Sequence, residues 1–168
     1  GYTSPEGIAA DLNGNVYVSD SMSSHAVQFW QGHRRPFEQA ALLFPRPLGF
    51  PQAHGIAVDG WGNVYFADGS HHRVTAFHCE GELLKSWGSQ GIQEGHLDSP
   101  EGIAVDDSGR VYVADTGNHR IQVFRGIARK SGKRTISGRF LRQWGSEGGD
   151  DGQFRSPWGI AIDGSGNV

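Results

Sequence analysis

The chain has 168 residues, including 26 Gly and 1 Cys, and its 15 Lys and Arg against 18 Asp and Glu give a net charge of −3. This length fits one domain with a buried core, and so small a charge does not define a class of partner. The single cysteine, Cys79, excludes an internal disulfide and a cysteine-based zinc module, and no apolar stretch reaches the ~20 residues of a membrane-spanning helix.

Four segments of the chain repeat one pattern, in which a Gly-Ile-Ala run is followed by an aspartate and a glycine-containing turn. The glycines that mark the segments are Gly7, Gly55, Gly102 and Gly159, spaced 48, 47 and 57 residues apart. A period of about 47 residues is typical of a four-stranded propeller blade. We therefore expect blades over about 5–50, 53–97 and 100–154, with an insertion in the third, and the start of a fourth over 157–168.

The second segment shows how one blade is built. The apolar run 56–58 predicts an inner strand, and the β-forming residues 64–67 predict the second strand. Residues 59–63 between them form a turn, because Asp bonds its own backbone while Gly and Asn accept positive φ. Residues 73–77 and 82–87 predict the third and outer strands.

The run from Ser99 to Asp106, continued by Val111 to Phe124, resembles the repeat of the NHL family. The resemblance implies an all-β propeller of four-stranded antiparallel blades, commonly six to a ring. The pattern breaks off at Val168, so we expect a fragment of about half a ring, taken from a longer protein. Such an open arc is expected to self-associate or to be marginally stable.

Strand parity places two kinds of loop on one face of the propeller, called here the top face: the loops that enter the inner strands and the loops that join strands two and three. The residues before the marker glycines, which lie at the mouth of the central channel on this face, are Glu6, His54, Glu101 and Trp158. The first three offer oxygen and nitrogen ligands for Zn²⁺ or Ca²⁺. The peptidylglycine-type amidating lyases, which are similar propellers, carry zinc-binding histidines at the comparable position, and only His54 matches them. The alternative is that all three are ordinary polar rim residues.

Three histidines also belong to the top face and are candidates for contact with a ligand or partner: His71, His72 and His119. No serine or cysteine is spaced with them as a nucleophile would be. Because the His-Arg pair recurs with the repeat, a structural role beside turn carboxylates such as Asp68 and Asp115 is the alternative. Trp158 breaks the aromatic period, which favours contact with a ligand.

Seven basic residues fall within residues 125–142, with no acidic residue between them, while the rest of the chain carries 8 basic and 18 acidic residues. The run falls at the third blade's strand three-to-four connection, which predicts a mobile loop on the bottom face. The residues expected to contact an anionic partner are Arg129, Lys130, Lys133 and Arg134. A merely solvated loop is the alternative.

These patterns favour a binding or scaffold module that presents top-face loops to a protein, peptide or small ligand. A metal-dependent lyase or hydrolase with its site around His54 is the second hypothesis. RNA binding, known for some NHL propellers, is the third, and the acidic background disfavours it. No residue pattern assigns a cellular compartment.

Overall fold

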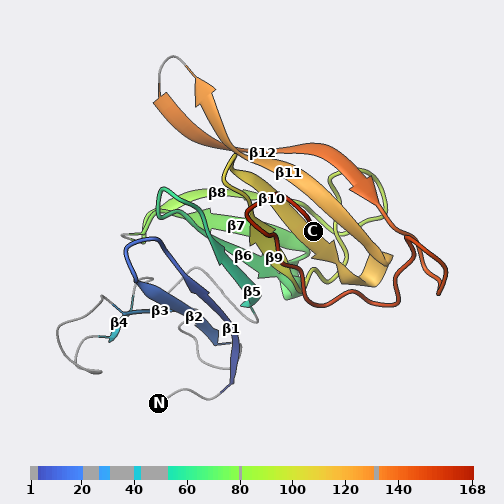
Figure 1. Ribbon diagram of the computed structural model, residues 1–168, viewed down its shortest axis with the longest axis horizontal. Coiled ribbons are helices and arrows are strands. Elements are labelled where there is room, and N and C mark those ends of the chain that lie inside the picture. Colours follow the sequence, from blue (N-terminus) through green and yellow to red (C-terminus); the bar gives the residue numbers. More distant parts are fainter. Residues whose placement is uncertain (1–3, 21–26, 31–39, 43–52, 80, 131–132) are drawn as a thin grey trace.

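The computed structural model describes residues 4–20, 27–30, 40–42, 53–79, 81–130 and 133–168. Within them the strands form three four-stranded antiparallel sheets, which lie side by side in Figure 1. The first sheet is β1 (Pro5–Ala10), β2 (Val16–Asp20), β3 (Val27–Trp30) and β4 (Ala40–Leu42). The second is β5 (Ala53–Val58), β6 (Val64–Asp68), β7 (Arg73–Phe77) and β8 (Leu83–Trp87). The third is β9 (Ile103–Val105), β10 (Arg110–Asp115), β11 (Arg120–Lys130) and β12 (Lys133–Trp144).

Each sheet follows chain order, so every strand pairs with its neighbour in sequence, as the expected all-β blades require. Strand β6 is buried along its whole length, because it lies in the middle of its sheet with further sheets on both sides. Short 3₁₀ turns, η1 (Gly69–His71) and η2 (Thr116–Asn118), join strands two and three of the second and third sheets. In the described part of the chain, no helix has the length and apolar character needed to cross a bilayer.

The turn between strands one and two is built the same way in every repeat. Asp59 accepts hydrogen bonds from the backbone amides of Trp61 and Asn63 and from the Asn63 side chain. The hydroxyl of Tyr65 donates to the same carboxylate. The other two blades repeat this bond between Tyr and Asp, as Tyr17 with Asp11 and Tyr112 with Asp106. The repeated tyrosine therefore has a structural role within each blade.

The main core lies between the second and third sheets. Trp87 at the end of β8 packs with Tyr65 on one side and with Phe124 of the next sheet on the other, at ring-centroid distances of 6.4 and 6.1 Å. Gly138 of β12 lies against the Trp87 ring, where a Cβ atom would come within 2.8 Å of it. Trp87 thus joins the second and third sheets.

The third sheet corrects one expectation. The basic run does not form a loop: residues 125–130 continue β11 and residues 133–142 belong to β12. A long hairpin forms because the inserted residues extend both strands. Their pairing runs from Ile121 opposite Trp144 to Lys130 opposite Lys133, with shifts of register on the way.

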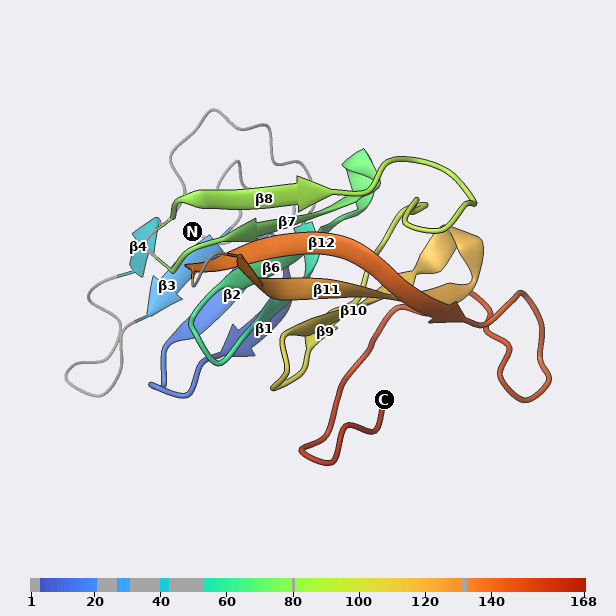
Figure 2. The same ribbon diagram turned by 90° about the horizontal axis from the view of Figure 1, so that it is seen from above.

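The segment after β12 contains no strand, and Figure 2 shows it as an irregular loop that leaves the end of β12 and returns beside the third sheet. Its turn at Asp163 nevertheless has the bonds of the earlier turns, with the backbone amides of Ser165 and Asn167 donating to the carboxylate. A strand forms only by pairing, and no neighbouring strand pairs with residues 157–168 in the described part of the chain. The fourth blade, the exact blade limits and a ring of six blades stay predictions.

Candidate functional site

The mouth of the inner strands is shaped by very close packing between blades. A Cβ atom at Gly7 would lie 2.7 Å from the carbonyl oxygen of His54 on the next inner strand. The same clash recurs between Gly55 and the carbonyl oxygen of Glu101. Only glycine fits at these positions, so the residues just before the marker glycines are drawn together around one axis.

Glu6, His54 and Glu101 meet at this mouth, each from a different sheet or from the segment that enters it. His54 Nδ1 lies 3.1 Å from Glu101 Oε2 and 3.9 Å from Glu6 Oε2. Their side chains are only partly covered, with exposed fractions of 27% for His54, 37% for Glu6 and 21% for Glu101. The mouth therefore offers two carboxylates and one imidazole to a ligand from solvent.

The environment of Glu101 disfavours a charged carboxylate. Burial raises the pKa of the Glu101 carboxyl, His54 lowers it and the nearby Glu6 carboxylate raises it again, so that the net direction is upward. A raised carboxyl pKa means that the charged form is less stable there than in water. A cation near Glu101 and Glu6 would stabilise the charged form of Glu101.

The three residues do not form a metal cage as they stand. Across the described residues, no group of three or more His, Cys, Asp or Glu side chains is arranged to hold a metal ion. His54 Nδ1 lies 3.1 Å from Glu101 Oε2, so this ring nitrogen already has a carboxylate beside it. Binding of Zn²⁺ or Ca²⁺ at these residues stays a prediction.

The candidate histidines occupy two kinds of place. His71 Nδ1 lies 2.9 Å from both carboxylate oxygens of the buried Asp68, at the end of η1. Asp68 also accepts a 2.9 Å hydrogen bond from Arg73 Nε. The His71 side chain is exposed, although its Nδ1 is bonded to Asp68.

His72 and His119 instead hold the next blade's entry loop. Both have left-handed backbones, with φ of 53° and 54°. His72 Nδ1 accepts a 3.0 Å hydrogen bond from the amide of Ser99, and His119 Nδ1 accepts one from Ser156. Asp98 Oδ1 is 3.1 Å from His72 Nδ1, but that nitrogen must carry a lone pair to accept from Ser99. The contact between His72 Nδ1 and Asp98 Oδ1 is therefore not an ion pair.

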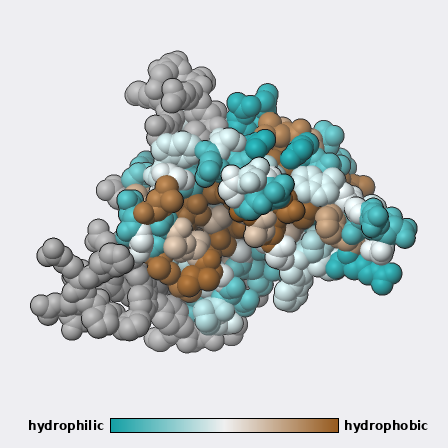
Figure 3. Space-filling view, in the orientation of Figure 1, coloured by the Kyte–Doolittle hydropathy of each residue, from teal (hydrophilic) through white to brown (hydrophobic). Residues whose placement is uncertain are grey.

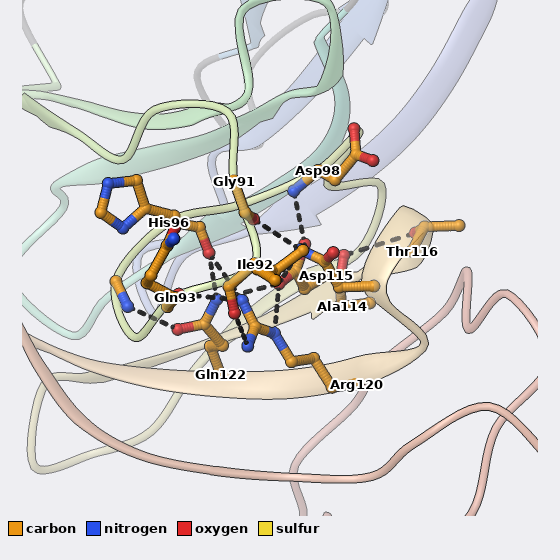
Figure 4. Close-up of polar contacts among 12 residues, drawn as sticks. Gly91, Ile92, Gln93, His96, Asp98, Ala114, Asp115, Thr116, Arg120 and Gln122 are labelled. Carbon is orange, nitrogen blue, oxygen red and sulfur yellow. Dashed lines mark hydrogen bonds and ion pairs between the residues drawn. The ribbon is translucent and has the colours of Figure 1, made fainter.

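The sequence placed the His-Arg pair beside Asp115 as an alternative, but it did not predict the wider polar cluster that Figure 4 shows around Asp115, Arg120 and Gln122. Arg120 Nε donates to Asp115 Oδ2 at 2.6 Å, and the rest of the guanidinium donates to backbone carbonyl oxygens. Those carbonyls, which belong to the connection between the second and third blades, are on Ile92, Gln93 and His96. Gln122 Nε2 joins Asp115 at 2.9 Å. The recurring His-Arg pair was the available signal, but the bonds to the connection depend on the fold.

The surface also has two apolar features. Trp158 has 72% of its surface exposed, and it occupies the mouth position of the last segment. In Figure 3 hydrophobic residues gather in the middle of the visible face. A pocket of about 110 Å³ lies at the ends of the inner strands opposite the mouth. Its lining includes Asp11, Asp59 and Asp106, whose carboxylates accept hydrogen bonds from the backbone of the turns between strands one and two.

Known structures share this arrangement of sheets. Hydrazine synthase of Kuenenia stuttgartiensis aligns with 99% of the chain at 20% identity and a TM-score of 0.64, and 42% of that protein is covered. A nidogen/laminin complex aligns with 96% of the chain at 20% identity and a TM-score of 0.59, with 53% of that chain covered. Virginiamycin B lyase of Staphylococcus aureus aligns with 84% at 17% identity and a TM-score of 0.56, with 41% covered. The chain thus spans about half or less of the length of these structures.

These likenesses establish the fold and no activity, because all the identities are 20% or below. No curated protein sequence matches the chain. The family model of the NHL repeat matches residues 97–124, which run from the entry of the third sheet through β10 and into the first part of β11. Residues 97–124 therefore match an NHL repeat, and the three four-stranded antiparallel sheets are those of a β-propeller fold.

Proposed function

We propose that this chain is a binding module that receives a peptide or protein ligand through a cationic group at the top-face mouth. The observation that carries the proposal is the meeting of Glu6, His54 and Glu101, with His54 Nδ1 3.1 Å from Glu101 Oε2. The raised pKa of Glu101 supports it, since an incoming Lys or Arg would stabilise the charged carboxylate. Trp158 adds an exposed aromatic surface of the kind found at binding hot spots.

A displayed library of random peptides tests this function. Peptides selected by the chain should be enriched in Lys and Arg, and Glu6→Gln/Glu101→Gln should weaken their binding about tenfold or more. Asp163→Asn is the matched control, because Asp163 is an exposed carboxylate of a turn away from the mouth. Selected peptides without cationic residues, or equal binding by the double variant, would contradict the proposal.

A metal-dependent lyase or hydrolase is the second candidate, favoured by the imidazole between two carboxylates at the mouth. Fold likeness to virginiamycin B lyase and streptogramin B lyase is compatible with it. If His54 binds a metal, added Zn²⁺ or Ca²⁺ should raise the melting temperature of the chain, and His54→Ala should abolish the rise. Identical melting curves with and without metal would eliminate this candidate.

A further inference from the structure

Two histidines hold the entry segments of successive blades by the same contact. His72 ends the turn η1 and His119 ends the turn η2, both with left-handed backbones. His72 Nδ1 accepts a 3.0 Å hydrogen bond from the amide of Ser99, and His119 Nδ1 accepts one of 3.0 Å from the amide of Ser156. We call these contacts the His72 joint and the His119 joint.

Both joints need an unprotonated ring nitrogen. A histidine nitrogen accepts a hydrogen bond only through its lone pair, whereas an imidazolium carries a proton on both nitrogens. Histidine is the side chain that ordinarily takes up a proton between about pH 5 and 8. Protonation of either ring therefore removes its hydrogen bond to the entry segment.

The two joints differ in the residue that precedes the serine. At the His72 joint this residue is Asp98, whose Oδ1 lies 3.1 Å from His72 Nδ1. A protonated His72 can therefore exchange the Ser99 amide for the Asp98 carboxylate, which keeps the entry segment attached. At the His119 joint the equivalent residue is Arg155, a cation that cannot accept from an imidazolium.

The other charged groups around the His119 joint do not take the place of Asp98. In the part of the chain that the structure describes, no carboxylate lies within ion-pair distance of the His119 ring. Asp115, in the same turn region, is bonded to the neighbouring Arg120, and Asp98 itself has its ion-pair contact with His72. The remaining acidic residues nearby in sequence belong to the connection after β12 and are Glu147, Asp150 and Asp151.

The His119 joint holds the segment that carries Trp158. Among the described residues, two hydrogen bonds join this segment to η2 and its end: that from Ser156 to His119, and one of 2.7 Å from Thr116 Oγ1 to the carbonyl oxygen of Pro157. We propose that His119 is an acid-sensitive latch, whose protonation frees the segment from Ser156 to Trp158 while the His72 joint stays closed. The place of Trp158 at the mouth then depends on pH, whether or not the mouth binds a cationic ligand.

Backbone order parameters from NMR relaxation of the whole chain test the latch. Between about pH 7.5 and pH 5, the order parameters of Ser156 and Trp158 should fall from about 0.85 to below about 0.6. Those of Ser99 and Glu101 should stay at about 0.85, and the buried strand β6 serves as the reference for an intact fold. An unchanged value at Ser156, or an equal fall at Ser99, would overturn the proposal.

Substitution of the residue before each serine gives matched variants. Arg155→Asp supplies a carboxylate like that of Asp98 and should keep Ser156 rigid at about pH 5, whereas Asp98→Asn should make Ser99 mobile there. His119→Asn, which suits a left-handed backbone, should make the order parameter of Ser156 independent of pH. Acid-induced mobility of Ser156 that persists in Arg155→Asp or His119→Asn would contradict the latch. So would a Ser99 that stays rigid in acid in Asp98→Asn.

Discussion

The hydroxyl of Tyr65 donates a 2.9 Å hydrogen bond to the carboxylate of Asp59, and both side chains are buried. The bond joins the middle of a blade to the turn that starts its second strand. Burial and the Asp59 charge both raise the pKa of Tyr65, so the phenol stays protonated and remains a donor. The same pair recurs in all three sheets, which makes it a unit of blade stability.

Asp59→Asn tests this unit. The amide NH₂ would face the donors of Asn63 and Tyr65, leaving buried groups unpaired. We expect the free energy of unfolding to fall by about 2–3 kcal/mol in urea titrations. The same change at Asp163, which is exposed, should leave the unfolding midpoint nearly unchanged. Equal effects at both aspartates would show that burial does not decide the strength of these turns.

Gly55→Ala tests the close approach of the inner strands. The added methyl group would meet the carbonyl oxygen of Glu101, and a backbone atom cannot move aside cheaply. We expect a loss of about 1–3 kcal/mol in stability, as overpacking usually causes. Gly159→Ala is the control, because a methyl group added there would have no atom within 4 Å. A harmless change at Gly55 would disprove the packing argument.

Arg120→Lys tests the cluster that fastens the blade-to-blade connection. Lysine keeps the charge but lacks the planar donors that reach Asp115 and the carbonyl oxygens of Ile92 and Gln93. Thermal unfolding should show a loss of about 2–3 kcal/mol. Arg73→Lys, at a side chain with 30% exposure and a bond to Asp68, should cost clearly less. The reverse order of the two effects would contradict the assigned role.

Stability should respond to pH with opposite signs at two carboxylates. The pKa of Glu101 is raised, so the folded chain binds this proton more tightly than the unfolded chain does. Its contribution to stability is therefore complete at low pH and is lost as pH rises above the ordinary value of 4.5. Glu101→Gln should remove this downward slope in unfolding titrations between about pH 4 and pH 7, and an unchanged slope would contradict it.

Asp106 acts in the other direction. Burial raises its pKa, but hydrogen bonds from Ser108 and Arg110 together outweigh burial, and the net direction is downward. The unfolded chain then binds this proton more tightly, so stability is gained above the ordinary value of 3.8 and lost as pH falls below it. Asp106→Asn should flatten acid unfolding below about pH 4. Acid unfolding as steep as that of the original chain would exclude this role.

We propose that the uncovered face of the first blade drives self-association. Ile8 is 73% exposed, whereas its repeat equivalents Ile56 and Ile103 are 7% and 6% exposed beneath a neighbouring inner strand. Sedimentation velocity should show association that Ile8→Ser weakens, because apolar area would no longer be buried. Ile92→Ser is the control, at a residue with 75% exposure in a connection. A concentration-independent monomer would rule the proposal out.

The sequence determined the structure of a single blade, because the residues of each repeat favour particular turns and strands locally. The aspartate turns, the β-forming strands and the marker glycines follow from residue types at fixed spacing, and the strand limits 73–77 agree with β7. The grouping of Glu6, His54 and Glu101 at one mouth also followed, since repeat position alone places them around an axis.

Tertiary structure decided what each of these side chains touches. Spacing alone could not tell that His72 and His119 accept from Ser99 and Ser156, because those bonds join residues 27 and 37 positions apart. Nor could it extend the basic run into a ribbon, since Gly and Ser in that run signal a loop unless cross-strand pairing outweighs them. Local propensity fixes turns and strands, whereas contacts between blades depend on how neighbouring sheets come to lie against one another.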